Sequence, residues 1–172
     1  MPIQIRRAEY SDLHELRELC ISTFCYAYEK FNTTADVEHY LLEHFSSEQL
    51  KEELSDEDSV FLVAVENEKL VGYVKIGLDP PKGIVNTIRP IEILRLYAAV
   101  DSIGKGVGRI LMSRTIDLAK ELKCDSIHLG VWQRNTLAIE FYKKCGYRIV
   151  GDVKFLFGSD LQDDHVMMLE IT

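Results

Sequence analysis

Apolar residues recur along this chain with two spacings, one typical of strands and the other of helices. Runs rich in β-branched and aromatic residues predict strands at 3–7, 60–65, 70–78, 91–100, 126–132, 147–157 and 166–171. Spacings of three and four residues predict helices from a Ser11-Asp12 cap to about 24, at 34–45, 47–54 and 107–122, and from Asn135 to about 145. The pattern therefore predicts an α/β (α+β) protein, in which helices and strands alternate.

Polar residues mark the ends of several of these elements. The polar segment 66–69 joins two strands and predicts an antiparallel hairpin. Ser46 or Ser47 can cap the helix at 47–54, and Asn135 can cap the last helix. Gly146 stands just past the end of that helix, where glycine is favoured because it adopts a left-handed conformation without strain.

The length and composition favour a single globular domain over residues 1–172. The chain is 47% hydrophobic and 28% charged, and it contains no Gly/Ser-rich linker or repeat. No apolar run approaches the roughly 18 residues of a membrane span, and the amino terminus does not resemble a signal peptide. We therefore expect no membrane partner.

Charge and cysteine usage narrow the functional classes. A net charge of -8 at pH 7 disfavours nucleic acid and is compatible with a cationic substrate. The four cysteines form no Cys-x-x-Cys pair and have no histidine at zinc-ligand spacing, so we expect no metal and a reducing, cytoplasmic location. Carboxy-terminal strands with exposed surfaces are compatible with a homodimer.

A glycine-rich segment joins the expected strand 91–100 to the helix at 107–122. It comprises Gly104, Lys105, Gly106, Val107, Gly108 and Arg109. Glycine tolerates the positive φ values that aim successive backbone N–H groups into one concavity, and the helix start adds unpaired donors. The segment therefore predicts an anion site, although an ordinary strand-to-helix turn has the same residues. It is not a Walker loop, because no Ser or Thr follows Lys105, and its alternating glycines do not fit a dinucleotide fingerprint.

Residues 103–108 resemble motif A of the GNAT superfamily of acetyl-coenzyme A-dependent N-acetyltransferases, with the pattern Gln/Arg-x-x-Gly-x-Gly/Ala. Ile103 stands in place of the opening Gln or Arg. A second segment resembles motif B, with Asn135, Ala138, Phe141-Tyr142 and Gly146-Tyr147 in order. The resemblance implies a mixed central sheet of about seven strands, flanked by helices, in which the fourth and fifth strands splay apart to admit acetyl-coenzyme A.

A narrower likeness spans nearly the whole chain. The segments 45–54, 72–75, 129–132 and 141–144 resemble the PaiA type of spermidine/spermine acetyltransferase. This resemblance implies acetyl transfer to a polyamine, by direct attack of the amine. Two other functions stay open: an acetyltransferase whose acceptor is a protein amino terminus, a lysine or an aminoglycoside, and a non-catalytic acyl-coenzyme A sensor.

The chemistry of an amine attacking a thioester assigns expected roles. An alkylammonium with a pKa of about 10.4 must lose a proton before it attacks, and Glu92 is the candidate to receive it. We expect Glu92 to share a strand face with Leu94, Leu96 and Ala98, although a solvent-facing carboxylate fits the same pattern. A backbone N–H near Ala98 is expected to stabilise the oxyanion, and Tyr142 to protonate the leaving thiolate.

The resemblance also implies the remaining contacts. Coenzyme contacts are expected from residues 104–109 and from Leu96, Tyr97, Ala98, Asn135 and Lys144. Tyr28, Glu29 and Trp132 are expected at the acceptor site. From the residues alone, Tyr142 and Trp132 are also compatible with ordinary core aromatics.

Overall fold

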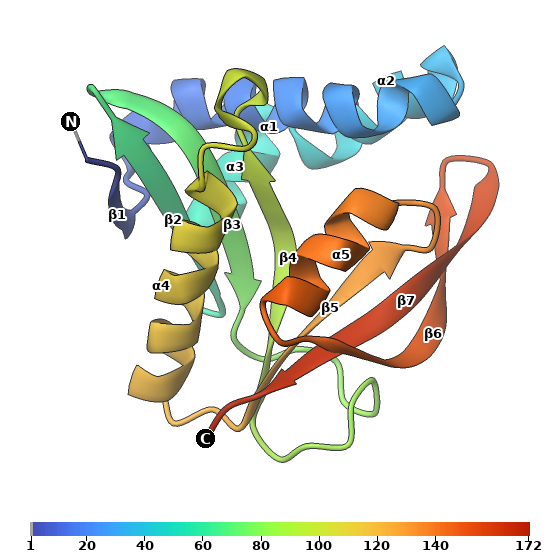
Figure 1. Cartoon of the computed structure of the whole chain (residues 1–172). Coiled ribbons are helices and arrows are strands. Elements are labelled where there is room, and N and C mark those ends of the chain that lie inside the picture. The colour runs from blue at the N-terminus through green and yellow to red at the C-terminus, as the bar shows by residue number, and fades with distance from the viewer. Residues whose placement is uncertain (1) are drawn as a thin grey trace.

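A seven-stranded mixed sheet forms the centre of the computed structural model, which describes residues 2–172 (Figure 1). The strand order is β1-β2-β3-β4-β5-β7-β6, and every pair is antiparallel except β4 with β5, which is parallel. The strands are β1 (Gln4–Arg7), β2 (Ser59–Glu66), β3 (Lys69–Gly77), β4 (Pro90–Ala98), β5 (Ser126–Trp132), β6 (Arg148–Phe157) and β7 (Asp160–Glu170).

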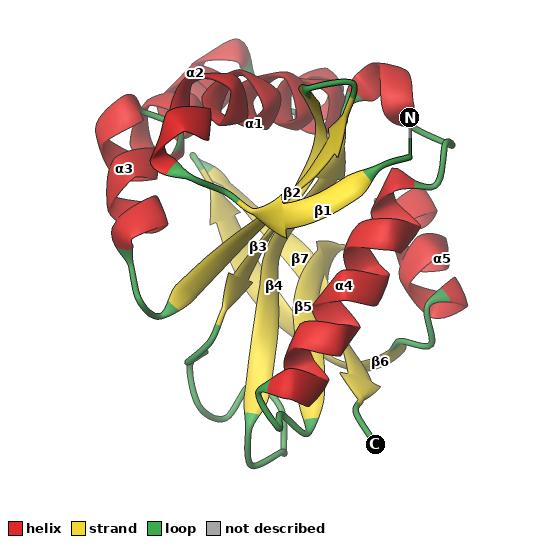
Figure 2. Ribbon diagram, turned by 90° about the vertical axis from the view of Figure 1, so that its left-hand side faces the viewer, coloured by secondary structure: helices red, strands yellow, loops and turns green. Residues whose placement is uncertain are grey.

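Helices cover both faces of this sheet, as Figure 2 shows. The helices are α1 (Leu13–Tyr28), α2 (Thr34–His44), α3 (Ser47–Ser55), α4 (Val107–Glu121) and α5 (Thr136–Lys144). One apolar core lies beneath α4 and α5 and includes Leu111, Leu129 and Met167. A second core lies between the sheet and α1 to α3, and it is rich in aromatic side chains such as Phe24, Phe45 and Tyr73. Among the helices of residues 2–172, none is both long and apolar enough to cross a membrane.

All seven expected strands and all five expected helices are present, with shifts at some ends. Ser46 caps α3 by accepting a hydrogen bond from the Gln49 N–H, and Asn135 caps α5 by accepting one from the Ala138 N–H. The expected hairpin joins β2 to β3, and its turn residues Asn67 and Glu68 both have positive φ. These local signals therefore predicted the turns and caps correctly.

Several ends differ from the prediction, and α1 continues to Tyr28 instead of ending near residue 24. Asp12 precedes α1, but its carboxylate accepts from the Glu9 N–H and from Arg6 instead of capping the helix. β4 ends at Ala98, because Val100 begins a 3-10 turn. β7 begins at Asp160 and not at 166, because its polar residues 160–165 pair with β6 across the hairpin. This part of β7 is a strand because it pairs with β6, and not because its own residues favour strands.

β4 and β5 separate halfway along their length. Residues Pro90–Ile93 pair with Ser126–Leu129, and beyond that point neither strand pairs with the other. The expected splay of the fourth and fifth strands is thereby confirmed. It leaves an open edge along the last five residues of β4.

A bulge at Leu94 changes which side chains of β4 share a face. Ile93 pairs with Ile76 and Arg95 with Lys75, so Leu94 is the extra residue in β4. Ile93 and Leu96 both belong to the core beneath α4, and Tyr97 packs into the other core. The prediction that Glu92 shares a face with Leu96 and Ala98 is therefore wrong, because the bulge places Glu92 on the face of Arg95 and Tyr97. Leu94 does lie on the side of Glu92, as expected, since both side chains line one cavity.

Candidate active site

The glycine-rich segment forms a cluster of backbone donors at the start of α4. Gly104 and Gly106 have φ values of +82° and +87°, a conformation that strains any other residue. The first bond of the helix runs from the Ile110 N–H to the Gly106 carbonyl, at 3.1 Å. The N–H groups of Val107–Arg109 are consequently left without a partner inside the helix, and the helix start carries partial positive charge. The geometry suits an anion.

Two close contacts hold this helix start in place. A Cβ on Gly108 would lie 3.3 Å from Phe141 Cζ, so α4 approaches α5 closely at this residue. A Cβ on Gly72, in β3, would lie 2.5 Å from Val107 Cγ1 and 2.9 Å from the Tyr97 carbonyl oxygen. Since real Cβ atoms do not approach so closely, Gly72 allows the first residue of α4 to sit on the sheet. The sequence analysis did not identify this role of Gly72.

The open edge of β4 presents backbone groups toward the gap. The Ala99 N–H donates to the Val71 carbonyl of β3, at 2.8 Å. N–H groups alternate in direction along a strand, so Tyr97 also points its N–H at β3, and Leu96 and Ala98 point theirs at the gap. The backbone donor that we expected near Ala98 therefore has the required direction.

Tyr142 lies on the buried face of α5. Its side chain belongs to the core beneath α4 and α5 and is buried, with 8% of its surface exposed. Burial raises the pKa of this phenol, and the nearby Tyr28 and Cys145 raise it further. Tyr142 is thus a neutral proton donor at physiological pH.

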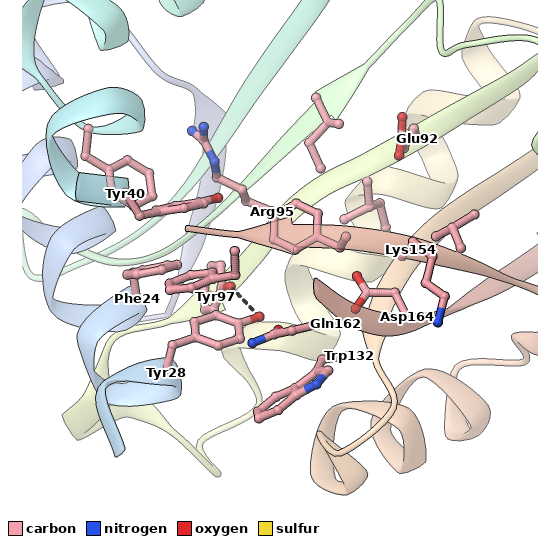
Figure 3. A pocket seen from close by; sticks show the side chains of 17 residues that line it. Phe24, Tyr28, Tyr40, Glu92, Arg95, Tyr97, Trp132, Lys154, Gln162 and Asp164 are labelled. Carbon is pink, nitrogen blue, oxygen red and sulfur yellow. Dashed lines mark hydrogen bonds between the residues drawn. The ribbon is translucent and has the colours of Figure 1, made fainter. Parts of the chain in front are cut away.

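A cavity of about 270 Å³ lies on the opposite face of the sheet, between α1, α2 and the β6–β7 hairpin (Figure 3). Its walls are largely aromatic and include Phe24, Tyr28, Tyr40, Tyr97, Trp132 and Phe157. Trp132 packs against Tyr28, with ring centroids 6.3 Å apart. Tyr28 and Trp132 are therefore at one cavity, as expected for an acceptor site. Glu29 is exposed and does not line it.

Four charged side chains line this cavity, and two of them are neutralised by neighbours. Arg95 donates to both carboxylate oxygens of Glu53, at 2.8 and 3.1 Å, and Lys154 forms an ion pair with Asp163. Glu92 and Asp164 form no ion pair with any residue of the described chain, 2–172. The cavity therefore keeps two carboxyl groups without an ion-pair partner in the described residues.

Burial raises the pKa of both free carboxyls. For Asp164 the adjacent Asp163 raises the pKa further, and His165 opposes it. Asp164 Oδ1 is buried without a hydrogen-bond partner in the described residues. A buried carboxylate oxygen without a partner is costly, so a bound cation would be stabilised at this position. Figure 3 shows Asp164 directed into the cavity, beside Lys154 and across from Glu92.

The structure thus places the expected residues in two groups. Residues 104–109, Asn135 and Tyr142 lie on the α4–α5 side, where Lys105, Arg109 and Lys144 are exposed. Glu92, Tyr28 and Trp132 lie at the aromatic cavity. Tyr97, which we expected to contact the coenzyme, also directs its side chain there, with its hydroxyl 3.5 Å from that of Tyr28.

Asp164 and Arg95 were missed by the sequence analysis. Asp164 lies in the part of β7 that was not predicted as strand, and Arg95 appears on the cavity face only because of the bulge.

Comparisons with known proteins agree with this geometry. A model of the Acetyltransferase (GNAT) family matches residues 16–147. A spermidine N(1)-acetyltransferase of Thermoplasma acidophilum is 26% identical over 153 residues, which are 87% of this chain and 90% of that protein. An uncharacterized N-acetyltransferase of Mycobacterium tuberculosis is 27% identical over 161 residues, 94% of this chain and 99% of the relative.

Among solved structures, the PaiA N-acetyltransferase of Thermoplasma acidophilum, in complex with coenzyme A, superposes with a TM-score of 0.81. It is 25% identical to this chain, and the superposition covers 99% of both chains.

Proposed function

The chain belongs to the GNAT family and is an N-acetyltransferase whose cosubstrate is acetyl-coenzyme A, and we propose that its acceptor is a polyamine such as spermidine or spermine. The observation that carries this proposal is a pair of carboxyl groups, Glu92 and Asp164, that line an aromatic cavity. Neither group has an ion-pair partner among residues 2–172. A polyamine has ammonium groups separated by methylene chains. Carboxylates suit the charges, and aromatic walls suit the methylenes. The relative named for spermidine supports the same substrate class.

On the coenzyme side, we assign the pyrophosphate to residues 104–109. The free N–H groups of Val107–Arg109 and the left-handed glycines before them supply the donors. Ile103 replaces the Gln or Arg of the family pattern, but backbone donors do not depend on that side chain. Asn135 and Lys144, at the two ends of α5, are assigned further contacts.

The acceptor must lose a proton before it can attack. An ammonium with a pKa of about 10.4 leaves about one amine in a thousand neutral at pH 7. Glu92 lines the cavity next to the open edge of β4, so its carboxylate first attracts the ammonium and then takes its proton. Burial raises the pKa of Glu92, which makes its carboxylate a better proton acceptor.

Two groups complete the transfer. The Ala98 N–H points into the gap between β4 and β5, where it stabilises negative charge that develops on the acetyl carbonyl oxygen. The Tyr142 hydroxyl gives a proton to the departing sulfur as the carbon–sulfur bond breaks. A thiol has a pKa of about 8.5, so this step needs only a weak acid, and Tyr142 contributes to the rate without being essential.

Release of the free thiol from acetyl-coenzyme A tests this function directly. The panel comprises spermidine, spermine, a monoamine of similar length, a peptide amino terminus and an aminoglycoside. We expect several-fold faster release with the polyamines, because one well-placed carboxylate contributes about 1 kcal/mol per charge. The preference should shrink as salt rises, since the screening length is about 10 Å at 0.1 M. Equal rates for spermidine and the monoamine at low salt would refute the polyamine assignment and leave the acetyltransferase activity intact.

The location and assembly of the protein stay predictions. All four cysteines are free in the structure, which agrees with the expected cytoplasmic location without testing it. β6 forms an outer edge of the sheet, where the expected homodimer has room to form. The residues described, 2–172, hold no cluster of three or more metal-ligating side chains.

A further inference from the structure

His128 is a buried, titratable side chain that the proposed mechanism does not use. It lies in the middle of β5 and is only 1% exposed. Neither ring nitrogen has a hydrogen-bond partner within residues 2–172. Most buried polar groups in native proteins are hydrogen-bonded, so an imidazole with two unpaired nitrogens calls for an explanation.

The register of the sheet places His128 beside Glu92. The two residues are direct partners in the parallel pairing of β4 with β5, so their side chains lie next to each other on one face. The next residue of β5 on that face is Gly130, which has no side chain to separate them from the cavity. Glu92 thus has the buried imidazole of β5 as its direct neighbour, near the end of the paired part of the two strands.

A second cavity of about 320 Å³ adjoins His128, beneath the loop that carries Pro81 and Ile84. Glu92 and Gly130 line this cavity and also the aromatic acceptor cavity. His128 lines only the second one. A proton that Glu92 takes from the acceptor cavity can therefore leave through the second cavity, where the imidazole of His128 lies.

We propose that His128 receives the substrate proton from Glu92 and releases it to water in the second cavity. This inference rests on the proposed function, because it requires an ammonium acceptor and Glu92 as the first base. The N–H bond of the ammonium breaks as an O–H bond forms on Glu92. A water molecule in the second cavity, which both side chains line, then takes the proton from Glu92 as it gives one of its own to a ring nitrogen of His128. Loss of this proton to water restores both side chains to their starting states.

The electrostatic surroundings favour such an exchange. Burial lowers the pKa of His128 and raises that of Glu92, which brings the proton affinities of the two groups closer together. The other charged groups that face this region are Lys154 on β6, which is paired with Asp163, and the Arg148–Glu170 pair at the ends of β6 and β7. The neighbour of His128 on β7 is the uncharged Met168. Glu92 is therefore the unpaired charge next to the ring.

The variant His128→Gln tests the proposal, with His165→Gln as a matched control. Glutamine is polar but does not take up a proton near neutral pH. His165 lies on β7, pairs with Val131 and bonds to Asp152, so its loss also removes an imidazole but not one beside Glu92. With spermidine, we expect His128→Gln to lower kcat about tenfold with little change in KM, and to move the rising limb of its pH profile to higher pH.

Added imidazole should partly restore kcat in His128→Gln and leave His165→Gln unchanged. A purely structural role for His128 would instead change KM or coenzyme binding, with no shift of the pH profile and no rescue. An unchanged kcat and pH profile in His128→Gln, alongside normal wild-type acetylation, would overturn the relay and leave the proposed function standing. Absence of amine acetylation by the wild-type protein would overturn both.

If His128→Gln does not fold, an NMR titration that measures the pKa of His128 in the wild-type protein and in Glu92→Gln tests the proposal instead. A negative Glu92 stabilises the imidazolium, so Glu92→Gln should lower the pKa of His128. If Glu92→Gln leaves the titration of His128 unchanged, the two groups are not coupled and the relay is wrong.

Discussion

The two sides of the splayed sheet present different kinds of atoms to the substrates that we assign to them. On the α4–α5 side, the groups assigned to the coenzyme are mostly backbone donors held by the left-handed Gly104 and Gly106. On the side of α1 to α3, the groups assigned to the acceptor are side chains that come from β4, α1, β5 and the β6–β7 hairpin. The segment assigned to the pyrophosphate is continuous in sequence, and the acceptor cavity is assembled from distant segments.

This difference has a physical consequence for substrate choice. A backbone site tolerates changes of most side chains, because its donors depend on φ values and on a helix start. A side-chain site changes with each substitution of Glu92, Asp164 or Trp132. The coenzyme should therefore be the more constant of the two substrates within this fold, and the acceptor the more variable.

The largest effect is expected from changes to the glycine-rich segment. Gly106→Pro is incompatible with a φ of +87°, because proline fixes φ near −65°. Gly108→Asp crowds Phe141 and places a negative charge at the helix start. Calorimetry with coenzyme A should show affinity reduced more than about 100-fold in both variants. For Gly108→Asp, the reason is that like charges about 4 Å apart cost about 4 kcal/mol near a surface.

A matched pair separates backbone strain from coenzyme binding. Gly106→Ala and Gly83→Ala both put a side chain on a residue with φ close to +87°, and a Cβ meets nothing within 4 Å at either position. Both should lose about 1 kcal/mol of stability. Affinity for coenzyme A should fall only in Gly106→Ala. Equal affinities in the two variants would contradict the placement of the pyrophosphate.

On the acceptor side, the largest effect on stability is expected at Glu53. This carboxylate of α3 is buried between Arg95 and Lys75, with the Lys75 Nζ at 3.1 Å. Replacing it by Gln leaves two partly buried cations without a partner. The free energy of unfolding at pH 7 should fall by about 3 kcal/mol, as measured by denaturant titration.

The same carboxylate makes stability depend on pH in a defined direction. Burial alone would raise the pKa of Glu53, but the hydrogen bond and charges of Arg95 and Lys75 outweigh it and hold the pKa below its ordinary value of 4.5. A lowered folded-state pKa stabilises the protein above pH 4.5, and that stability is lost as the pH falls through the folded-state value. The difference between wild type and Glu53→Gln should thus shrink in acid. A difference that stays constant down to pH 3 would show that the ion pairs do not stabilise the fold.

Tyr142→Phe should have a moderate effect, confined to turnover. The hydroxyl acts on the departing sulfur and not on the bound coenzyme, so kcat should fall about tenfold while the Kd for coenzyme A stays nearly the same. Steady-state kinetics and calorimetry on one preparation measure both quantities. A weaker Kd with normal turnover would mean that Tyr142 is a packing residue.

The smallest effect is expected at Asp164. Asp164→Asn removes the charge assigned to the second ammonium, so the preference for spermidine over a monoamine should fall several-fold. Asp117→Asn is the control, because Asp117 is an exposed aspartate of α4 that does not line the cavity. An equal loss of rate with both amines would show that Asp164 does not recognise the second charge.

Local signals predicted the coenzyme side well. Strand, glycines and helix follow one another between 91 and 122, and the Asn135 cap and Gly146 delimit α5, so each feature depended on residues close in sequence. The acceptor side was predicted less well. Pairing with β3 produces the bulge at Leu94, and pairing with β6 extends β7 over Asp164. The local pattern of apolar residues does not reveal which strands pair with each other. The sheet faces on which Glu92 and Asp164 lie could therefore not be predicted from the sequence.

A crystal structure of the protein with coenzyme A and spermidine bound together tests the division between the two sides most directly. We expect pyrophosphate oxygens at about 3 Å from the N–H groups of Val107–Arg109. The attacking amine should lie against Glu92, and a second ammonium should lie within about 4 Å of Asp164. A pyrophosphate away from the start of α4, or a polyamine bound outside the aromatic cavity with both carboxylates still unpaired, would contradict this arrangement.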